Sequence, residues 1–156
     1  METGPEFAFI AQNIELAIAP VFLIAGIGAL LNVLTNRLAR VVDRGRTLER
    51  EIASEADGEP REMHIAELTG LDTRMVRINR AIMLATLAAL LICVVIVSLF
   101  TGEIVHLDLS NVIAVLFIAA MLALIFGLVS FMGEIAISAK SLRVTQQYRR
   151  KSGGRR

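Results

Sequence analysis

The stretch from residue 14 to residue 50, IELAIAPVFLIAGIGALLNVLTNRLARVVDRGRTLER, decides the fold of this chain. Its start carries an acid, Glu15, and the sequence then stays apolar to Leu34, about 20 residues, which is enough to cross ~30 Å of hydrocarbon. Pro20 falls in the first turns of this run, where a missing N–H costs least. Arginines follow at positions 37, 40, 44, 46 and 50. An acidic start, an apolar middle and a basic end predict a membrane-spanning helix and its direction.

Two further apolar runs, 81–100 and 112–132, extend the pattern. The first is interrupted only by Thr86 and Ser98, and the second only by Ser130. Hydrophobic residues make up 55% of the 156 residues, against roughly 45–50% in a soluble domain. A secretory signal peptide is disfavoured, because the N-terminal METGPEFAFIAQNIE has acids where a basic segment is required. We therefore predict an all-α integral membrane protein with three transmembrane helices.

The basic residues are distributed very unevenly along the chain. Of the 16 lysines and arginines, nine lie between residues 37 and 80 and seven between residues 140 and 156. Residues 1–36 and 81–139 contain none. Because basic residues in short flanking segments stay in the cytoplasm, both basic segments are predicted to be cytoplasmic. The orientation is then N-out/C-in.

These assignments set the boundaries that we predict within a single membrane domain, 1–156. They are an outside leader (1–13), a first transmembrane helix (14–35), a cytoplasmic helical hairpin (36–80), a second transmembrane helix (81–101), an outside loop (102–110), a third transmembrane helix (111–133) and a cytoplasmic basic tail (134–156). Apolar residues recur at helical spacing from Leu38 to Ile52 and again from Ile65, with turn residues between at 54–62. We therefore expect the hairpin to be continuous with helices 1 and 2. The third helix is expected to continue for about two turns past Met132.

Small residues let helices approach closely in lipid. In the first span they make the middle narrow, at Ala25, Gly26, Gly28 and Ala29. In the second and third spans they recur at steps of four and form a small-residue face, at Ala81, Ala85, Ala89 and Cys93 and at Ala119, Ala123 and Gly127. Three short spans bury little surface by themselves, so we predict a homo-oligomer.

A polar stripe runs along the first span at helical spacing. Its members are Glu15, Phe22, Ala25, Ala29, Asn32, Asn36 and Arg40. Polar groups inside a span are costly and normally face protein or water. Two interpretations stay open. The stripe is a packing face on which Asn32 hydrogen-bonds a neighbouring helix, or it lines an ion or small-solute pore in an oligomer, with Glu15 attracting cations outside.

A second candidate group lies where the spans meet the cytoplasm. Its members are Asn36, Arg37, Asn79, Arg80 and Glu134, which the predicted boundaries place at one depth. Arg37 or Arg80 could form a bidentate pair with Glu134 and so tie the third span to the hairpin. We interpret this group mainly as a structural tie that sets helix register, with gating or proton relay as the alternative.

The arginine-rich hairpin is expected to lie against anionic lipid at the cytoplasmic leaflet. The arginines concerned are Arg37, Arg40, Arg44, Arg77 and Arg80. Nucleic-acid binding is disfavoured, because many acids share the same segment. An enzyme is also disfavoured: His64 and His106 fall on opposite sides of the membrane, and no Cys/His cluster predicts a metal or cofactor site.

Three strings carry a resemblance to a known family. IAPVFLIAGIGALLNVLTNRLARVVDRGR, the later INRAI and the FMGEI that ends the third span resemble a bacterial family of small three-span membrane proteins, which has only a domain-of-unknown-function label. The resemblance covers about 13–143. It implies a three-span membrane protein and brings no reaction, ligand or partner. For function, we expect a homo-oligomeric structural or regulatory scaffold whose hairpin docks a cytoplasmic protein, or alternatively an oligomeric channel lined by the first span.

Overall fold

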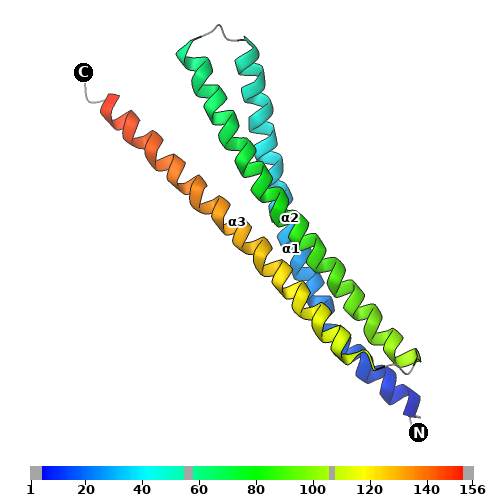
Figure 1. Cartoon of the computed structure of the whole chain (residues 1–156). Coiled ribbons are helices and arrows are strands. Elements are labelled where there is room, and N and C mark those ends of the chain that lie inside the picture. Colours follow the sequence, from blue (N-terminus) through cyan, green and yellow to red (C-terminus); the bar gives the residue numbers. More distant parts are fainter. Residues whose placement is uncertain (1–4, 55–57, 106–107, 153–156) are drawn as a thin grey trace. The chain divides into compact units, whose positions relative to one another are not determined.

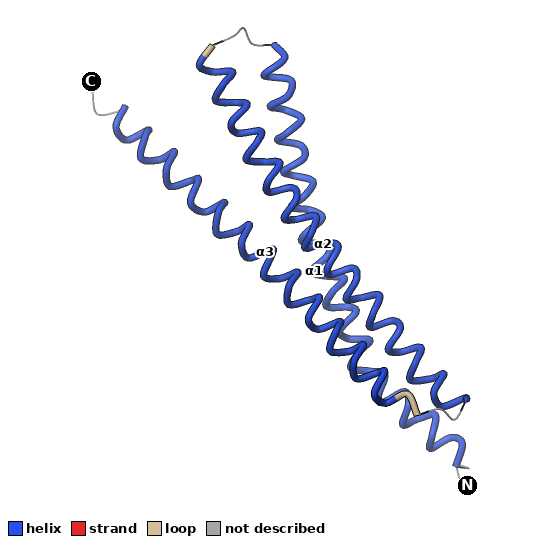
Figure 2. The backbone as a smooth tube through the Cα atoms, in the orientation of Figure 1, coloured by secondary structure: helices blue, strands red, loops and turns tan. Residues whose placement is uncertain are grey.

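The computed structural model describes residues 5–54, 58–105 and 108–152, apart from the side chains of 5–13, 59–60, 103 and 134–152. Over these residues the chain forms three helices, α1 (Pro5–Ser54), α2 (Glu59–Val105) and α3 (Ser110–Ser152), as Figures 1 and 2 show. Each contains a segment long and apolar enough to cross a membrane. The prediction of an all-α protein with three helices long and apolar enough to span a membrane is therefore confirmed.

The helix α1 begins earlier than the first span was predicted to begin. Because the helix starts at Pro5, Pro20 lies in its interior rather than in its first turns, so that expectation was wrong. The chain nevertheless stays helical through Pro20 to Ser54. Membrane helices tolerate proline because neighbouring groups can satisfy the carbonyl that loses its partner.

The connection between α1 and α2 is shorter than the predicted turn at 54–62. Near the end of α1 the hydroxyl of Ser54 donates to the carbonyl of Glu51 at 2.9 Å. The carbonyl of Gly58 accepts from the backbone N–H groups of Arg61 at 3.1 Å and Glu62 at 3.3 Å, so Gly58 begins the hydrogen-bond pattern of α2. Proline at position 60 then falls in the first turn, where it needs no N–H partner.

The start of α3 is held by an acidic cap. One carboxylate oxygen of Asp108 accepts from both the N–H of Ser110, at 3.1 Å, and its hydroxyl, at 2.6 Å. These bonds lower the pKa of Asp108, the hydroxyl contact contributing most. The helix then runs to Ser152, well beyond two turns past Met132, which corrects the expected length. Alanine, leucine, lysine, arginine and glutamine, which favour helix, are frequent in this extension.

The described residues fall into two compact units, and the first comprises the chain up to residue 36 together with 82–127. Parts of all three helices contribute to its core. Its buried apolar residues are Ala17, Ile27 and Leu34 of α1, Ala85, Ala88, Ile92 and Val95 of α2, and Ala120 and Ala123 of α3. Alanines at the centre allow close helix packing without a hydrophobic driving force between lipid-solvated helices.

The buried face of α2 differs from the predicted small face. Ala85 is buried as expected, but Ala89 is only half-buried and Cys93 is exposed, while Ala88 and Ile92 are fully buried. Steps of four residues drift around a helix with 3.6 residues per turn, whereas alternating steps of three and four stay on one face. In α3 the buried face contains Ala120, Ala123 and Gly127, whereas Ala119 of the predicted small face is half-buried.

The second unit comprises residues 37–81 and the part of α3 from residue 128. Within it, residues 37–54 of α1 and 59–81 of α2 form an antiparallel pair, which we call the arm. Leu48 and Ile78 are fully buried in this unit. Gly45 is also buried, and a Cβ at this position would lie 3.9 Å from Cδ1 of Leu68, so the two helices approach closely here.

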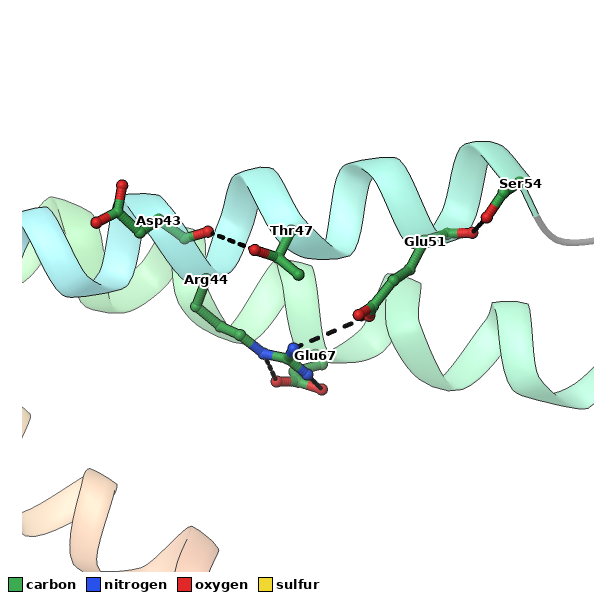
Figure 3. Close-up of polar contacts among 6 residues, drawn as sticks. All are labelled: Asp43, Arg44, Thr47, Glu51, Ser54 and Glu67. Atoms are coloured by element: carbon green, nitrogen blue, oxygen red, sulfur yellow. Dashed lines mark hydrogen bonds and ion pairs between the residues drawn. The ribbon is translucent and has the colours of Figure 1, made fainter.

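A polar contact joins the two helices of the arm (Figure 3). The guanidinium of Arg44 donates from Nε to Oε1 of Glu67 at 3.0 Å and from Nη2 to Oε2 at 3.2 Å. Glu51 lies 3.9 Å from Nη1 of the same guanidinium. The hydrogen bonds that Arg44 donates to the Glu67 carboxylate raise the pKa of Arg44 above its ordinary value. Both side chains of the pair are 44% exposed, so water screens the attraction and the pair sets register more than stability.

Candidate functional site

The predicted polar stripe lies on the exposed surface of α1. Phe22 is 74% exposed. The other members are also exposed: Glu15, Ala25, Ala29, Asn32, Asn36 and Arg40. The buried side of the same segment carries Ile27 and Leu34. Among the described residues, the stripe therefore lies on the side of α1 opposite to its buried apolar residues.

The two asparagines of the stripe bond to each other. Nδ2 of Asn36 donates to Oδ1 of Asn32 at 3.2 Å, one helical turn apart. Beside them, the hydroxyl of Thr35 donates to the backbone carbonyls of Leu31 at 2.9 Å and Asn32 at 3.1 Å. These contacts satisfy part of the polar capacity of the asparagines. Each amide can make further hydrogen bonds, because an asparagine side chain has two N–H donors and an oxygen that accepts two bonds.

The glycines next to the stripe are open to their surroundings. A Cβ built at Gly26 or at Gly28 meets no atom within 4 Å. Asn32 lies five residues before Arg37, so along a helix axis it is about 7 Å inside the apolar segment from the first arginine. An exposed surface of glycine, alanine and asparagine at this depth is typical of helix–helix contacts in membranes.

The predicted interface network is only partly described. The guanidinium of Arg37 lies 5.2 Å from the centre of the Phe131 ring, a cation–π distance that links α1 to α3. Asn79 and Arg80 are exposed on α2. The side chain of Glu134 lies outside the described residues, so its ion pair stays a prediction. The sequence analysis did not predict the contact of Arg37 with Phe131. The position of this aromatic residue at the end of the third span was the signal that could have indicated it.

A cavity of about 290 Å³ opens between the two helices of the arm. Its walls are Arg37, Arg40, Val41, Arg44, Leu71, Arg74 and Ile78. Sequence reasoning singled out Arg37, Arg40 and Arg44 as lipid-facing but missed Arg74, which only the pairing of the two helices brings to the same cavity. Arg77 and Arg80, singled out equally, do not line it. Four arginines and three apolar residues thus line the same cavity.

A second cavity, of about 300 Å³, lies in the first unit and is lined by apolar side chains. They are Ile14, Ala17, Ile18, Val21, Phe22, Ile96 and Phe100. It offers no hydrogen-bonding side chain and carries no chemistry of its own. In the part of the chain that the structure describes, no three His, Cys, Asp or Glu side chains gather closely enough to hold a metal ion.

A comparison with protein families identifies the group to which these features belong. The family model of the DUF2721 proteins, a family of unknown function, matches residues 17–144. The chain belongs to the DUF2721 family. The match confirms the resemblance seen in the sequence and covers the arm and the stripe on α1 from Phe22 onward. No curated protein and no solved structure matches this DUF2721 protein.

Proposed function

We propose that this DUF2721 protein is a homo-oligomeric structural or regulatory scaffold of the bacterial inner membrane, without enzymatic activity. The observation that carries the proposal is the stripe of α1, which has the composition of a helix–helix contact and is exposed among the residues that the structure describes. A second copy of the same chain is the simplest partner, since it presents the same surface and allows a symmetric contact.

The threading that we propose is N-out/C-in. The segment 1–36 has no basic residue, whereas the arm carries all the arginines from Arg37 to Arg80. This asymmetry supports a cytoplasmic arm, which is the helical hairpin expected from the sequence. A reporter fused ahead of Glu15 is expected to be active outside the cytoplasm, and a cytoplasmic reporter there would refute the threading.

The arm supports the scaffold role. Its apolar seam and the contact between Arg44 and Glu67 hold two helices together, and most of its remaining charged side chains are exposed. The 18 residues of α1 in the arm, from residue 37 to residue 54, extend about 27 Å along the helix axis. Such a charged rod is suited to docking a cytoplasmic protein, which we propose as its partner.

Disulfide cross-linking in native membranes tests the oligomer. In a Cys93→Ser background, Gly28→Cys places a thiol beside the stripe and Val97→Cys places one on an exposed face of α2. We expect oxidation to give a dimer band with Gly28→Cys and much less with Val97→Cys. Equal bands, or no dimer with Gly28→Cys, would contradict the proposed contact.

A second measurement tests the asparagines. Interhelical hydrogen bonds in membranes contribute about 0.6–2 kcal/mol, so Asn32→Leu is expected to weaken association about three- to thirtyfold. The matched control is Val33→Leu, an exposed apolar neighbour whose replacement removes no hydrogen bond. Association constants from fluorescence energy transfer in liposomes give both values, and an unchanged constant for Asn32→Leu removes the asparagines from the interface.

An oligomeric ion or small-solute channel is the second candidate. The observation that favours it is the exposure of Asn32 and Asn36, which in a ring of copies could face a central axis and replace hydration water. Liposome flux separates the two functions. Flux that disappears in Glu15→Gln and Asn32→Ala, but persists in the exposed α2 variant Cys93→Ala, supports the channel. No flux under any gradient leaves the scaffold.

A further inference from the structure

The arm carries charges of opposite sign in its two halves. The near half, which follows the apolar segments, is 37–48 and 65–80, with seven arginines and three acids, a net charge of +4. The far half, 49–64, has six acids and two arginines, a net charge of −4. These balances count every charged side chain, whether or not it has a partner, and take His64 as neutral. Attraction to anionic lipid explains the near half but not the acidic far half.

The part of α3 beyond its apolar segment has the opposite charge. Between residue 135 and Ser152, where α3 ends, there is no acid. The same stretch has five basic residues, which are Lys140, Arg143, Arg149, Arg150 and Lys151. The helix α3 from residue 128 belongs to the same compact unit as the arm. One unit therefore contains an acidic half of the arm and a basic extension of α3.

One contact sets the register between α1 and α3. The guanidinium of Arg37 lies 5.2 Å from the centre of the Phe131 ring, and both helices run away from their apolar segments at this point. Because every α-helix rises 1.5 Å per residue, two helices that continue side by side from this contact advance equally. Arg143, twelve residues beyond Phe131, then lies at the level of Glu49, twelve residues beyond Arg37.

The second helix of the arm extends the match. A Cβ at Gly45 would lie 3.9 Å from Leu68, so these two positions share a level, and Glu62 lies six residues further toward the far end. Glu49 and Glu62 are both exposed. In this register only Lys140 of the five basic residues lies beside the near half. The other four lie at or beyond the level of Glu49, beside the far half.

We propose that the extension of α3, residues 134–152, docks lengthwise on the far half of the arm of the same chain and completes a three-helix bundle. Exposed ion pairs contribute little individually. The contact at Arg37 makes this docking intramolecular, so that several weak pairs act at high effective concentration. The same contact argues for the same chain rather than a second copy. The inference goes beyond the scaffold and depends on neither the threading nor the oligomer.

Distance measurement between two spin labels by pulsed electron paramagnetic resonance tests the proposal. The full-length protein in lipid nanodiscs carries Ala53→Cys and Gln147→Cys in a Cys93→Ser background, two positions that share a level in this register. Neighbouring helix axes lie about 8–10 Å apart, so we expect one narrow distance below about 30 Å at low salt. Salt at about 1 M, where the Debye length is about 3 Å, should broaden it.

Charge variants locate the contact on the arm. Glu49→Gln with Glu62→Gln should lower the equilibrium constant for docking about two- to tenfold. The matched control, Asp43→Asn with Asp72→Asn, removes two exposed acids of the near half and should change it less than about twofold. Equal losses from the two pairs would overturn the assignment to the far half. Glu49→Asp with Glu62→Asp keeps both charges, and a loss as large as that of the glutamine pair would show a steric rather than an electrostatic effect and overturn the proposal.

Two further outcomes decide whether docking occurs and which chain supplies the extension. A broad distribution for the wild-type charges at low salt would overturn docking itself. Diluting the doubly labelled chain with an excess of unlabelled chain separates the two sources of the extension. A short distance that persists supports docking within one chain. A short distance that disappears on dilution would assign the extension to a second copy and overturn the proposal.

Discussion

Replacing Leu48 with alanine is expected to loosen the whole arm. The Leu48 side chain is 0% exposed, where the apolar faces of the two helices meet. Leucine-to-alanine changes in protein cores cost about 2–5 kcal/mol, because transfer free energy is lost and a cavity remains. A two-helix arm can partly collapse around the gap, so we expect the lower end, about 2 kcal/mol, or roughly a thirtyfold rise in the population of the opened arm.

Hydrogen exchange measured by mass spectrometry in lipid nanodiscs reports this population directly. Peptides from both helices of the arm should exchange about thirtyfold faster in Leu48→Ala, since local opening exposes them together. Peptides from the apolar run 82–100 should be unaffected. The matched control is Met63→Ala, whose side chain is 64% exposed on the same arm, and for which we expect about twofold or less. If the two variants exchange alike, the arm is not held by this seam, and a rigid docking scaffold cannot be maintained.

Three further predictions concern individual residues. Gly70→Ala should stabilise the arm by about 0.5–1 kcal/mol, because Gly70 is an exposed glycine inside α2 and an added Cβ would meet nothing within 4 Å. Slower hydrogen exchange of the arm amides would confirm this stabilisation, and faster exchange would refute it. Ala88→Leu should destabilise the first unit by about 1–3 kcal/mol, because the added atoms overpack a buried position. Cys93→Leu, on the exposed side of α2, should leave the stability unchanged. Thermal melting in detergent compares the two variants, and similar melting temperatures would contradict the assignment of Ala88 to the buried face. The pKa of Asp108 is lowered on folding, so its cap contributes fully above its ordinary value of 3.8 and is lost as the pH falls through the lower folded value. Exchange of the Ser110 amide, corrected for its intrinsic pH dependence, should therefore rise in strong acid in the wild type but not in Asp108→Asn, which keeps an acceptor that does not titrate; equal pH dependence in both would exclude the cap.

The sequence by itself determined the membrane class and the helices of this protein. Apolar runs of about 20 residues can satisfy their backbone groups in lipid only as helices or barrels, and the period of the flanking segments selects helix. The string around Asn32 also showed the resemblance to the family, and the match over residues 17–144 confirms that resemblance. The stripe on α1 could also be predicted from the sequence, because helical spacing alone decides which residues share a face.

Only the tertiary structure decided which faces meet. Small residues at steps of four indicated a close-packing face through Ala89 and Cys93, but the residues of α2 that are buried within the chain include Ala88 and Ile92. The pairing of Arg44 with Glu67 and the arrival of Arg74 in the cavity of Arg37 depend on contacts between segments distant in sequence. A periodic pattern fixes the angular position of a side chain on its own helix; the rotation and register of the neighbouring helix come from the fit of all contacting side chains together.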